Sequence, residues 1–496
     1  MNFARDIVEA ASPGALALVE LARDGSRREW SFGEVALSSA AMAASLRAAG
    51  VRRGDVVLTL VGNRFEWICA MVACLRAGYV VLPCTEQLRA KDLAQRLALT
   101  SPAAIVCDER NRAELETAAP DCPVLLVPDP ALIDPARAGD APPFADLRED
   151  EPCLITFTSG TAGEPKAVVH GQRYLSGQAL QAEHWLGARP GELVWCTAAS
   201  GWSKSARNVF IAPWLRGAPA LLHDARFDPT ERVEIIERER VGVLCMAPTE
   251  FRVIAKRAQP RPVDSLRALV AAGEALDAGV LGAFRDATGL WIRDGYGQTE
   301  TGQTTGQPAG RDPVPGSMGL PLPGVRLWID DGELCLDPAT DPTFFLGYLG
   351  EDVTRGENGS WSVADRRTGG PWRTGDRVAQ DDGGYLHFEG RADDVIISAG
   401  YRIGPFEVES ALVSHPAVAD AAAVAAPDEE RGSVVRAVVV LRDGHAPSDS
   451  LARELQEHVK AQTAPYKYPR IVEFAAELPR TSSGKIRRAA LREQRT

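Results

Sequence analysis

Short apolar runs alternate along the chain with longer stretches in which apolar residues recur every three or four positions. In the first third, the short runs cover residues 55–61, 104–107 and 124–127 and are rich in β-branched residues. Runs of this kind are typical of buried parallel strands, and periodic stretches are typical of the helices that cover them. The pattern therefore predicts an α/β fold.

The middle of the chain continues the same pattern. Residues 154–157, 241–246 and 266–270 are further short apolar runs. In parallel sheets, ligand-binding loops follow the carboxyl ends of such strands. Residues 351–370 differ, because Gly, Ser, Arg and Asp dominate with little periodicity. This segment predicts a loop or a small antiparallel region, which is a weak place for catalysis.

Beyond Arg391 the pattern begins again. Residues 395–397 and 434–441 predict strands, and 405–413 and 451–459 predict helices. The first helix has Pro405 at a favourable first position and should end before Pro416. A chain of 496 residues also exceeds one ordinary hydrophobic core. We expect a large N-terminal domain, residues 1–391, with mixed and parallel sheets flanked by helices, and a small α/β domain, residues 392–496.

Composition excludes several classes of function. Hydrophobic residues make up 45% and charged residues 25%, as in globular proteins, and the net charge of -12 comes without a basic block. We therefore expect no nucleic-acid surface. Apolar stretches such as 58–81 are interrupted by charges before the ~20 residues of a spanning helix, so we expect no integral membrane contact. Nine scattered cysteines without a CxxC pair, and no signal-peptide pattern, favour the cytoplasm.

A loop rich in glycine and hydroxyl groups follows the run 154–157. Its residues are Thr158, Ser159, Gly160, Thr161, Ala162, Gly163, Glu164, Pro165 and Lys166. Backbone N–H groups, hydroxyls and a lysine at a strand end suit phosphate oxygens, although such clusters also form ordinary surface turns. The common Gly-x4-Gly-Lys-Ser/Thr spacing is absent.

The order Ser-Gly-Thr-x-Gly-x-Pro-Lys resembles the adenylate-forming superfamily, which includes acyl-CoA synthetases, peptide-synthetase adenylation domains and luciferases. Four further motifs follow in the superfamily's order: Tyr296-Gly-Gln-Thr-Glu300, Trp372-Arg-Thr-Gly-Asp376, Gly390-Arg-Ala-Asp-Asp394 and Arg480-Thr-Ser-Ser-Gly-Lys-Ile486. Segments 400–405 and 464–470 most resemble those of medium-chain acyl-CoA synthetases. The resemblance spans nearly the full length.

The resemblance implies an acid–thiol ligase. It would use ATP to turn a carboxylic acid, of the medium-chain, branched or aromatic kind, into an acyl adenylate. It would then pass the acyl group to coenzyme A and release AMP and pyrophosphate. By resemblance, Lys485, Thr299 and Arg402 are catalytic, and Glu300 binds Mg²⁺. Beyond the phosphate loop, the residues expected to hold ATP are Asp294, Gly295, Tyr296, Gly297, Gln298, Thr299, Asp376, Arg391 and Lys485.

The second step needs a binding site for coenzyme A. The residues that the resemblance assigns to it are Gln87, Ala399, Gly400, Tyr401, Arg431, Lys460, Tyr468, Pro469 and Arg470. The superfamily's C-terminal domain rotates between the two steps, so the small domain is expected to be mobile, with Asp393 as its hinge.

The acyl pocket is expected at Trp202, Gly273, Glu274 and Lys204. Family members often carry Asp-Thr-Gly-Trp where this chain has Ala199-Ser200-Gly201-Trp202, so the preferred acid stays open. Lys204 and Arg207 have two interpretations: contact with a polar group of the acid, or anchoring of backbone carbonyls.

Two alternatives remain beside this hypothesis. An adenylating enzyme with a carrier-protein thiol or an amine as acceptor would need only the ATP motifs. A nucleotide or acyl-CoA sensor would have no use for Lys166, Glu300, Asp376, Arg391 and Lys485 together. A homodimer is left open by the sequence.

Overall fold

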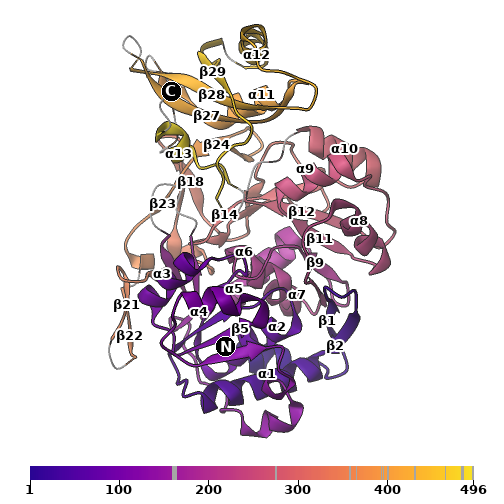
Figure 1. Ribbon diagram of the computed structural model, residues 1–496, viewed down its shortest axis with the longest axis vertical. Coiled ribbons are helices and arrows are strands. Elements are labelled where there is room, and N and C mark those ends of the chain that lie inside the picture. The colour runs from indigo at the N-terminus through magenta and orange to yellow at the C-terminus, as the bar shows by residue number, and fades with distance from the viewer. Residues whose placement is uncertain are drawn as a thin grey trace.

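The computed structural model describes residues 1–158, 165–273, 276, 278–356, 359–364, 366–391, 394, 396–398, 401–428, 432–463, 465–481 and 485–493. Its N-terminal part is built on two large sheets, which helices separate and cover (Figure 1). Strand order, counted over these residues, is β20-β8-β7-β4-β3-β5-β6 in one sheet and β13-β12-β11-β9-β10-β1-β2 in the other.

The first sheet is mixed. Strands β7, β4, β3, β5 and β6 run parallel, whereas β8 pairs antiparallel with both of its neighbours, β7 and β20. The strands are β3 (Val56–Leu60), β4 (Val80–Cys84), β5 (Ala104–Asp108), β6 (Val124–Val127), β7 (Pro152–Phe157), β8 (Ala167–Gly171) and β20 (Gly347–Tyr348).

The second sheet is parallel except at its edge, where β2 pairs antiparallel with β1. The strands are β1 (Leu16–Leu21), β2 (Arg27–Ser31), β9 (Val194–Cys196), β10 (Ala220–His223), β11 (Val243–Met246), β12 (Ala268–Ala272) and β13 (Ile292–Gly295). The predicted runs all became strands, with ends shifted by a residue or two.

Helices form three layers around these sheets. The largest apolar cluster joins one face of each sheet to the helices between them, namely α1 (Phe32–Ala48), α2 (Phe65–Ala77), α5 (Arg173–Gln181) and α7 (Ala212–Leu215). The outer face of the second sheet is covered by α8 (Pro229–Arg238), α9 (Pro248–Arg257) and α10 (Ala278–Thr288). The outer face of the first sheet is covered by α3 (Ala90–Thr100) and α4 (Arg112–Thr117).

A four-stranded antiparallel sheet follows, made of β18 (Leu327–Asp330), β19 (Glu333–Leu336), β23 (Trp372–Gln380) and β24 (Leu386–Arg391). Beside it, β21 (Val353–Arg355) and β22 (Trp361–Val363) form the small antiparallel pair expected within residues 351–370. In Figure 1 the four-stranded sheet lies between the two large sheets and the C-terminal part, and β21 and β22 lie at the lower left, beside the N-terminal part.

The C-terminal part has cores of its own, formed on the two faces of one small sheet. Its strands are β25 (Ile396–Ser398), β26 (Tyr401–Ile403), β27 (Val418–Asp428), β28 (Gly432–Leu441) and β29 (Ile471–Phe474), and its helices are α11 (Pro405–Val413), α12 (Asp449–Gln462) and α13 (Arg488–Glu493). The expected fold class, with a large N-terminal and a small C-terminal α/β unit, is confirmed. None of the helices in the described ranges is long and apolar enough to cross a membrane.

Candidate active site

A sharp turn brings the two large sheets together at the carboxyl ends of their strands. It lies between β9 and α6 (Ser203–Ala206), at Gly201, whose φ is +90°. A Cβ atom at Gly201 would lie 2.1 Å from the backbone nitrogen of Thr85, directly after β4. Only glycine fits this approach. The turn therefore holds Trp202 and Lys204 at the edge where ligand loops gather.

Lys204 reaches across to the end of β12. Its Nζ donates a hydrogen bond to the carbonyl oxygen of Ala272 at 2.8 Å. Next in the chain, Gly273 has φ +103°, and a Cβ there would lie 2.9 Å from Lys204 Nζ. Of the two interpretations of Lys204, the structure contains the backbone anchor. The neighbouring Glu274 lies outside the described residues.

Thr158 and Lys166, the two ends of the predicted phosphate loop, lie between β7 and β8 and bond to each other. The backbone N–H of Thr158 donates to the carbonyl of Lys166 at 2.9 Å, and the N–H of Lys166 donates to Thr158 Oγ1 at 3.2 Å. Its predicted members 159–164 lie outside the described residues. The ammonium of Lys166 lies 2.9 Å from Glu351 Oε1 and 4.5 Å from the ring centre of Tyr348.

Glu300 lies beside this lysine and is held at two points. Its carboxylate oxygen Oε1 accepts a 2.8 Å hydrogen bond from the hydroxyl of Tyr348. Its carbonyl accepts another, also 2.8 Å, from the N–H of Phe345. Burial, reinforced by the charge of Glu300, raises the pKa of Tyr348, so this hydroxyl stays a donor. Lys166, Tyr348 and Glu300 thus form one contact chain.

Asp376 is the centre of a second cluster. It is 5% exposed, and its Oδ2 accepts hydrogen bonds from the Tyr296 hydroxyl and, at 2.8 Å, from Gln298 Nε2. Arg391 faces it across β23 and β24 and donates to Oδ1 at 3.1 Å. The indole N–H of Trp372 holds Gln298 Oε1 at 3.1 Å. Residues of three motifs, Tyr296 and Gln298 from the first, Asp376 from the second and Arg391 from the third, therefore meet at one carboxylate.

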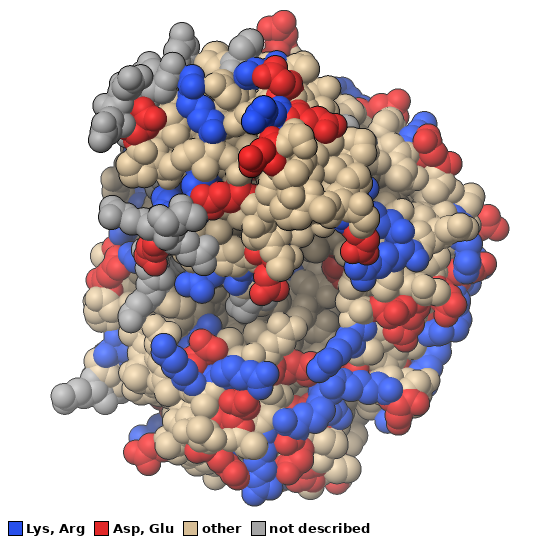
Figure 2. Space-filling view, turned by 45° about the horizontal axis from the view of Figure 1, so that its top comes forward, with Lys and Arg blue, Asp and Glu red and all other residues tan. Residues whose placement is uncertain are grey.

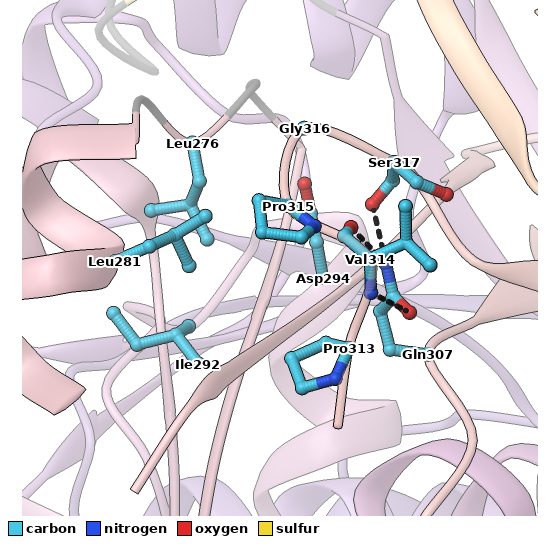
Figure 3. A pocket seen from close by; sticks show the side chains of 10 residues that line it. All are labelled: Leu276, Leu281, Ile292, Asp294, Gln307, Pro313, Val314, Pro315, Gly316 and Ser317. Carbon is cyan, nitrogen blue, oxygen red and sulfur yellow. Dashed lines mark hydrogen bonds between the residues drawn. The ribbon is translucent and has the colours of Figure 1, made fainter. Parts of the chain in front are cut away.

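Asp294, expected beside adenine, lies one residue before the end of β13. Burial raises the pKa of its carboxyl group to about 8, and its Oδ1 accepts from the N–H of Gly295 at 2.8 Å. It also lines a cavity of about 10 Å³, room for a single water, beside a loop that Gln307 holds at Val314 and Ser317 (Figure 3). A nucleobase cannot enter so small a space. If adenine binds here, it must lie outside this cavity.

Three of the residues assigned to coenzyme A meet in the C-terminal part. The Tyr468 ring has Lys460 Nζ 4.2 Å and the Arg470 guanidinium 5.0 Å from its centre. Pro469 between them is buried, whereas Gln87 is exposed in the loop after β4. Outside the described residues lie Ala399, Gly400, Arg431, Asp393 and the side chains of Tyr401 and Arg402.

Lys485 is exposed, and its backbone is bonded to Thr481. Its N–H donates to Thr481 Oγ1 at 3.1 Å, and its carbonyl accepts from the Thr481 N–H at 2.8 Å. The surface is hollowed between the C-terminal part and the rest, with Lys and Arg side chains along the lower rim (Figure 2). Acidic side chains are interspersed on the same face, so no uniformly basic surface appears there.

Two residues of this site, Tyr348 and Glu351, are not apparent from the sequence. Tyr348 joins Lys166 to Glu300, and Glu351 pairs with Lys166 although its segment was expected to be a weak place for catalysis. The aromatic residues of the run Phe344-Phe345-Leu-Gly-Tyr348 indicate a packed segment. They do not indicate which residues the segment contacts. Nearby, Trp372 and Arg366 line a cavity of about 320 Å³ to which no predicted site residue contributes.

Comparison with known proteins identifies the family. The model of the AMP-binding enzyme matches residues 6–356, and that of the AMP-binding enzyme C-terminal domain matches residues 407–485. The chain belongs to the AMP-binding enzyme family. This confirms the resemblance to the adenylate-forming superfamily, and an AMP-forming acid–thiol ligase is the enzyme class that its relatives support.

Two relatives and one solved structure illustrate the match. The uncharacterized acyl–CoA ligase YtcI of Bacillus subtilis is 38% identical over 95% of this AMP-binding enzyme and 91% of its own length. The mitochondrial acyl-coenzyme A synthetase ACSM3 of Mus musculus is 37% identical over 99% and 90%. The crystal structure of the anthranilate CoA ligase AuaEII with anthranoyl-AMP has a TM-score of 0.85, with 27% identity over 99% and 96%.

Proposed function

We propose that this AMP-binding enzyme joins a carboxylic acid to coenzyme A in two steps. The acid first attacks the α-phosphorus of ATP, forming an acyl adenylate and releasing pyrophosphate. The thiol of coenzyme A then attacks the adenylate carbonyl, and AMP leaves. The observation that supports the proposal is the convergence of three motifs on Asp376, beside a second cluster in which Tyr348 joins Glu300 to Lys166. Attack on the α-phosphorus requires groups that position the nucleotide in this way.

The nucleotide would lie between these two clusters. Asp376 and Arg391 would hold the ribose hydroxyls, and Asp294, Gly295 and Tyr296 would frame adenine. Thr299 would contact the α-phosphate. The loop 158–166 would hold the departing pyrophosphate, for which the ammonium of Lys166 supplies charge.

Mg²⁺ fits the donor set at Glu300. Over the described residues, no group of three His, Cys, Asp or Glu side chains is placed to hold a metal. Glu300 offers one carboxylate, with Oε1 held by Tyr348 and Oε2 accepting no hydrogen bond from any described residue. One carboxylate with phosphate oxygens and waters is a common magnesium site. When bound, the ion would neutralise phosphate charge.

Coenzyme A would bind across the C-terminal part. The stacked Lys460, Tyr468 and Arg470 offer an aromatic face and two cations, which suit the adenine ring and phosphates of coenzyme A. Gln87, Ala399, Gly400, Tyr401, Pro469 and Arg431 would complete this site, with Arg402 near the acyl group.

The two steps would use one cleft in turn. We assign residues 1–391 and 392–496 to two domains that rotate about Asp393, bringing Lys485 to the carboxylate and α-phosphate only for adenylation. Lys485→Ala should stop adenylate formation but let a supplied acyl adenylate react with coenzyme A. Asp393→Pro should leave pyrophosphate exchange largely intact and suppress thioester formation. Equal loss of both half-reactions in either variant contradicts this division.

The acid would enter between Trp202, Gly273, Glu274 and Lys204. Medium-chain, branched and aromatic acids are the proposed class. The test is AMP release from ATP across a panel of acids of varied length and polarity, each with and without coenzyme A. Release that requires both acid and coenzyme A supports the proposal. Release indifferent to coenzyme A favours a carrier-protein thiol or an amine as acceptor.

Location and assembly complete the proposal. All nine cysteines are unpaired, which fits a reducing cytoplasm. Sedimentation equilibrium would show whether the enzyme forms a homodimer.

A further inference from the structure

One short segment holds the Glu300 loop at three successive points. Thr343 Oγ1 donates to the carbonyl of Thr301 at 2.5 Å, and the Phe345 N–H donates to the carbonyl of Glu300 at 2.8 Å. The hydroxyl of Tyr348 donates to the carboxylate of Glu300, also at 2.8 Å. Two of these bonds fix the backbone, and only Tyr348 reaches the side chain.

The segment is itself rigidly mounted. Arg173, which is 6% exposed, donates to the carbonyl oxygens of Phe344 at 2.8 Å and Phe345 at 3.1 Å. Tyr348 pairs with Val168 where β20 adds to the edge of the first sheet. A hydroxyl carried on a sheet strand is held more precisely than one on a free loop.

The ring of Tyr348 contacts Lys166. The ring centre lies 4.5 Å from Lys166 Nζ, so one side chain touches both the cation proposed for pyrophosphate and the carboxylate proposed for the metal. Its hydroxyl and its ring therefore have separable contacts. Substitutions that remove one and keep the other are available.

We propose that Tyr348 is a positioning residue that orients the carboxylate of Glu300 toward the metal and supports Lys166 beneath the pyrophosphate. This rests on the proposed function. The terminal torsion of a glutamate is broad, so a free carboxylate samples many directions. The bond from Tyr348 to Oε1 fixes this rotation and gives Oε2 one direction. Outer partners of metal ligands commonly contribute in this way.

The test measures metal binding without turnover. Mn²⁺, which accepts the same oxygen ligands, is titrated by electron paramagnetic resonance against the full chain with a non-hydrolysable ATP analogue. Tyr348→Phe should weaken Mn²⁺ binding about tenfold, the lower end of the loss of an outer-shell partner. Tyr348→Leu should also weaken metal-free nucleotide binding about two- to fivefold, because Lys166 loses the ring. Tyr385→Phe, which is not in the site, is the matched control.

Two results would overturn the inference. One is Mn²⁺ binding by Tyr348→Phe within twofold of the unmodified chain. The other comes from a double-mutant cycle with Glu300→Gln. If Tyr348→Phe weakens Mn²⁺ binding equally in the Glu300→Gln background, Tyr348 does not act through the carboxylate of Glu300. An unmodified chain that binds Mn²⁺ and the analogue but activates no acid contradicts the proposed function instead, and a Mn²⁺ loss in Tyr348→Phe still supports the role of Tyr348.

Discussion

Asp376→Asn tests the proposed ribose site because the carboxylate of Asp376 already accepts three hydrogen bonds from protein side chains. It accepts from Tyr296 and Gln298 on Oδ2 and from Arg391 on Oδ1. An amide has one acceptor oxygen and one NH₂ group. Whichever way it is turned, the NH₂ group faces a donor. The less costly orientation keeps the oxygen toward Tyr296 and Gln298 and loses the hydrogen bond from Arg391. Arg391 still donates to the Thr374 carbonyl at 3.1 Å.

The expected losses follow from these contacts. A hydrogen bond between charged groups contributes about 1.5–3 kcal/mol, and partial exposure of Arg391 reduces this to about 1–2 kcal/mol of folding stability. A carboxylate has about four acceptor positions, so with three taken it has about one left for a ribose hydroxyl. Losing that bond costs a further ~1.5–3 kcal/mol of binding, or about 10- to 150-fold in ATP affinity.

Isothermal titration with ATP, without acid or coenzyme A, measures the binding loss, and denaturant unfolding measures stability. Asp381→Asn, in the exposed turn between β23 and β24, is the matched control. The reasoning is refuted if Asp376→Asn binds ATP within twofold of the unmodified protein while its unfolding midpoint is lowered, because Asp376 then serves the fold and not the nucleotide.

Three further changes have expected outcomes. Burial raises the pKa of Asp294 from 3.8 to about 8, so the free energy of unfolding of the unmodified protein should fall as the pH rises from about 4 to 8. Asn cannot ionise, so the urea midpoint of Asp294→Asn should rise relative to that of the unmodified protein between pH 5 and 8. Gly273→Ala should displace Lys204 and cost about 1–3 kcal/mol of stability, and acid panels should shift toward smaller acids. Arg488→Met leaves the buried Glu409 carboxylate without its 2.7 Å ion pair and should cost about 3–5 kcal/mol, seen as earlier proteolysis of the C-terminal part.

Local rules predicted much of the fold. The helix at 405–413 has the predicted bounds, because Pro405 favours a helix start and Pro416 prevents continuation. The apolar runs became buried strands. The second expected helix, 451–459, is longer at both ends, and Ser448 caps it by accepting from the Leu451 N–H. Capping and fraying lie outside what apolar periodicity detects.

The contacts within the site were less predictable. Motifs named Glu300, Lys166 and Asp376, but Tyr348 reaches Glu300 only because β20 joins β8 across 176 or more residues of chain. Glu351 meets Lys166 for the same reason. Such pairings depend on tertiary packing, and neither composition nor spacing encodes them. For Lys204 the sequence left two interpretations, a ligand contact or a backbone anchor. In the structure its ammonium group donates to the Ala272 carbonyl.

The central claim is that the acid is activated as an acyl adenylate, and oxygen transfer tests it most directly. A carboxylic acid labelled with ¹⁸O in its carboxyl group is incubated with the enzyme, ATP, Mg²⁺ and coenzyme A, and the products are examined by mass spectrometry. Attack of the carboxylate on the α-phosphorus predicts one ¹⁸O atom in AMP, formed together with the acyl-CoA thioester. Label in inorganic phosphate with release of ADP, or AMP without label, would contradict the account.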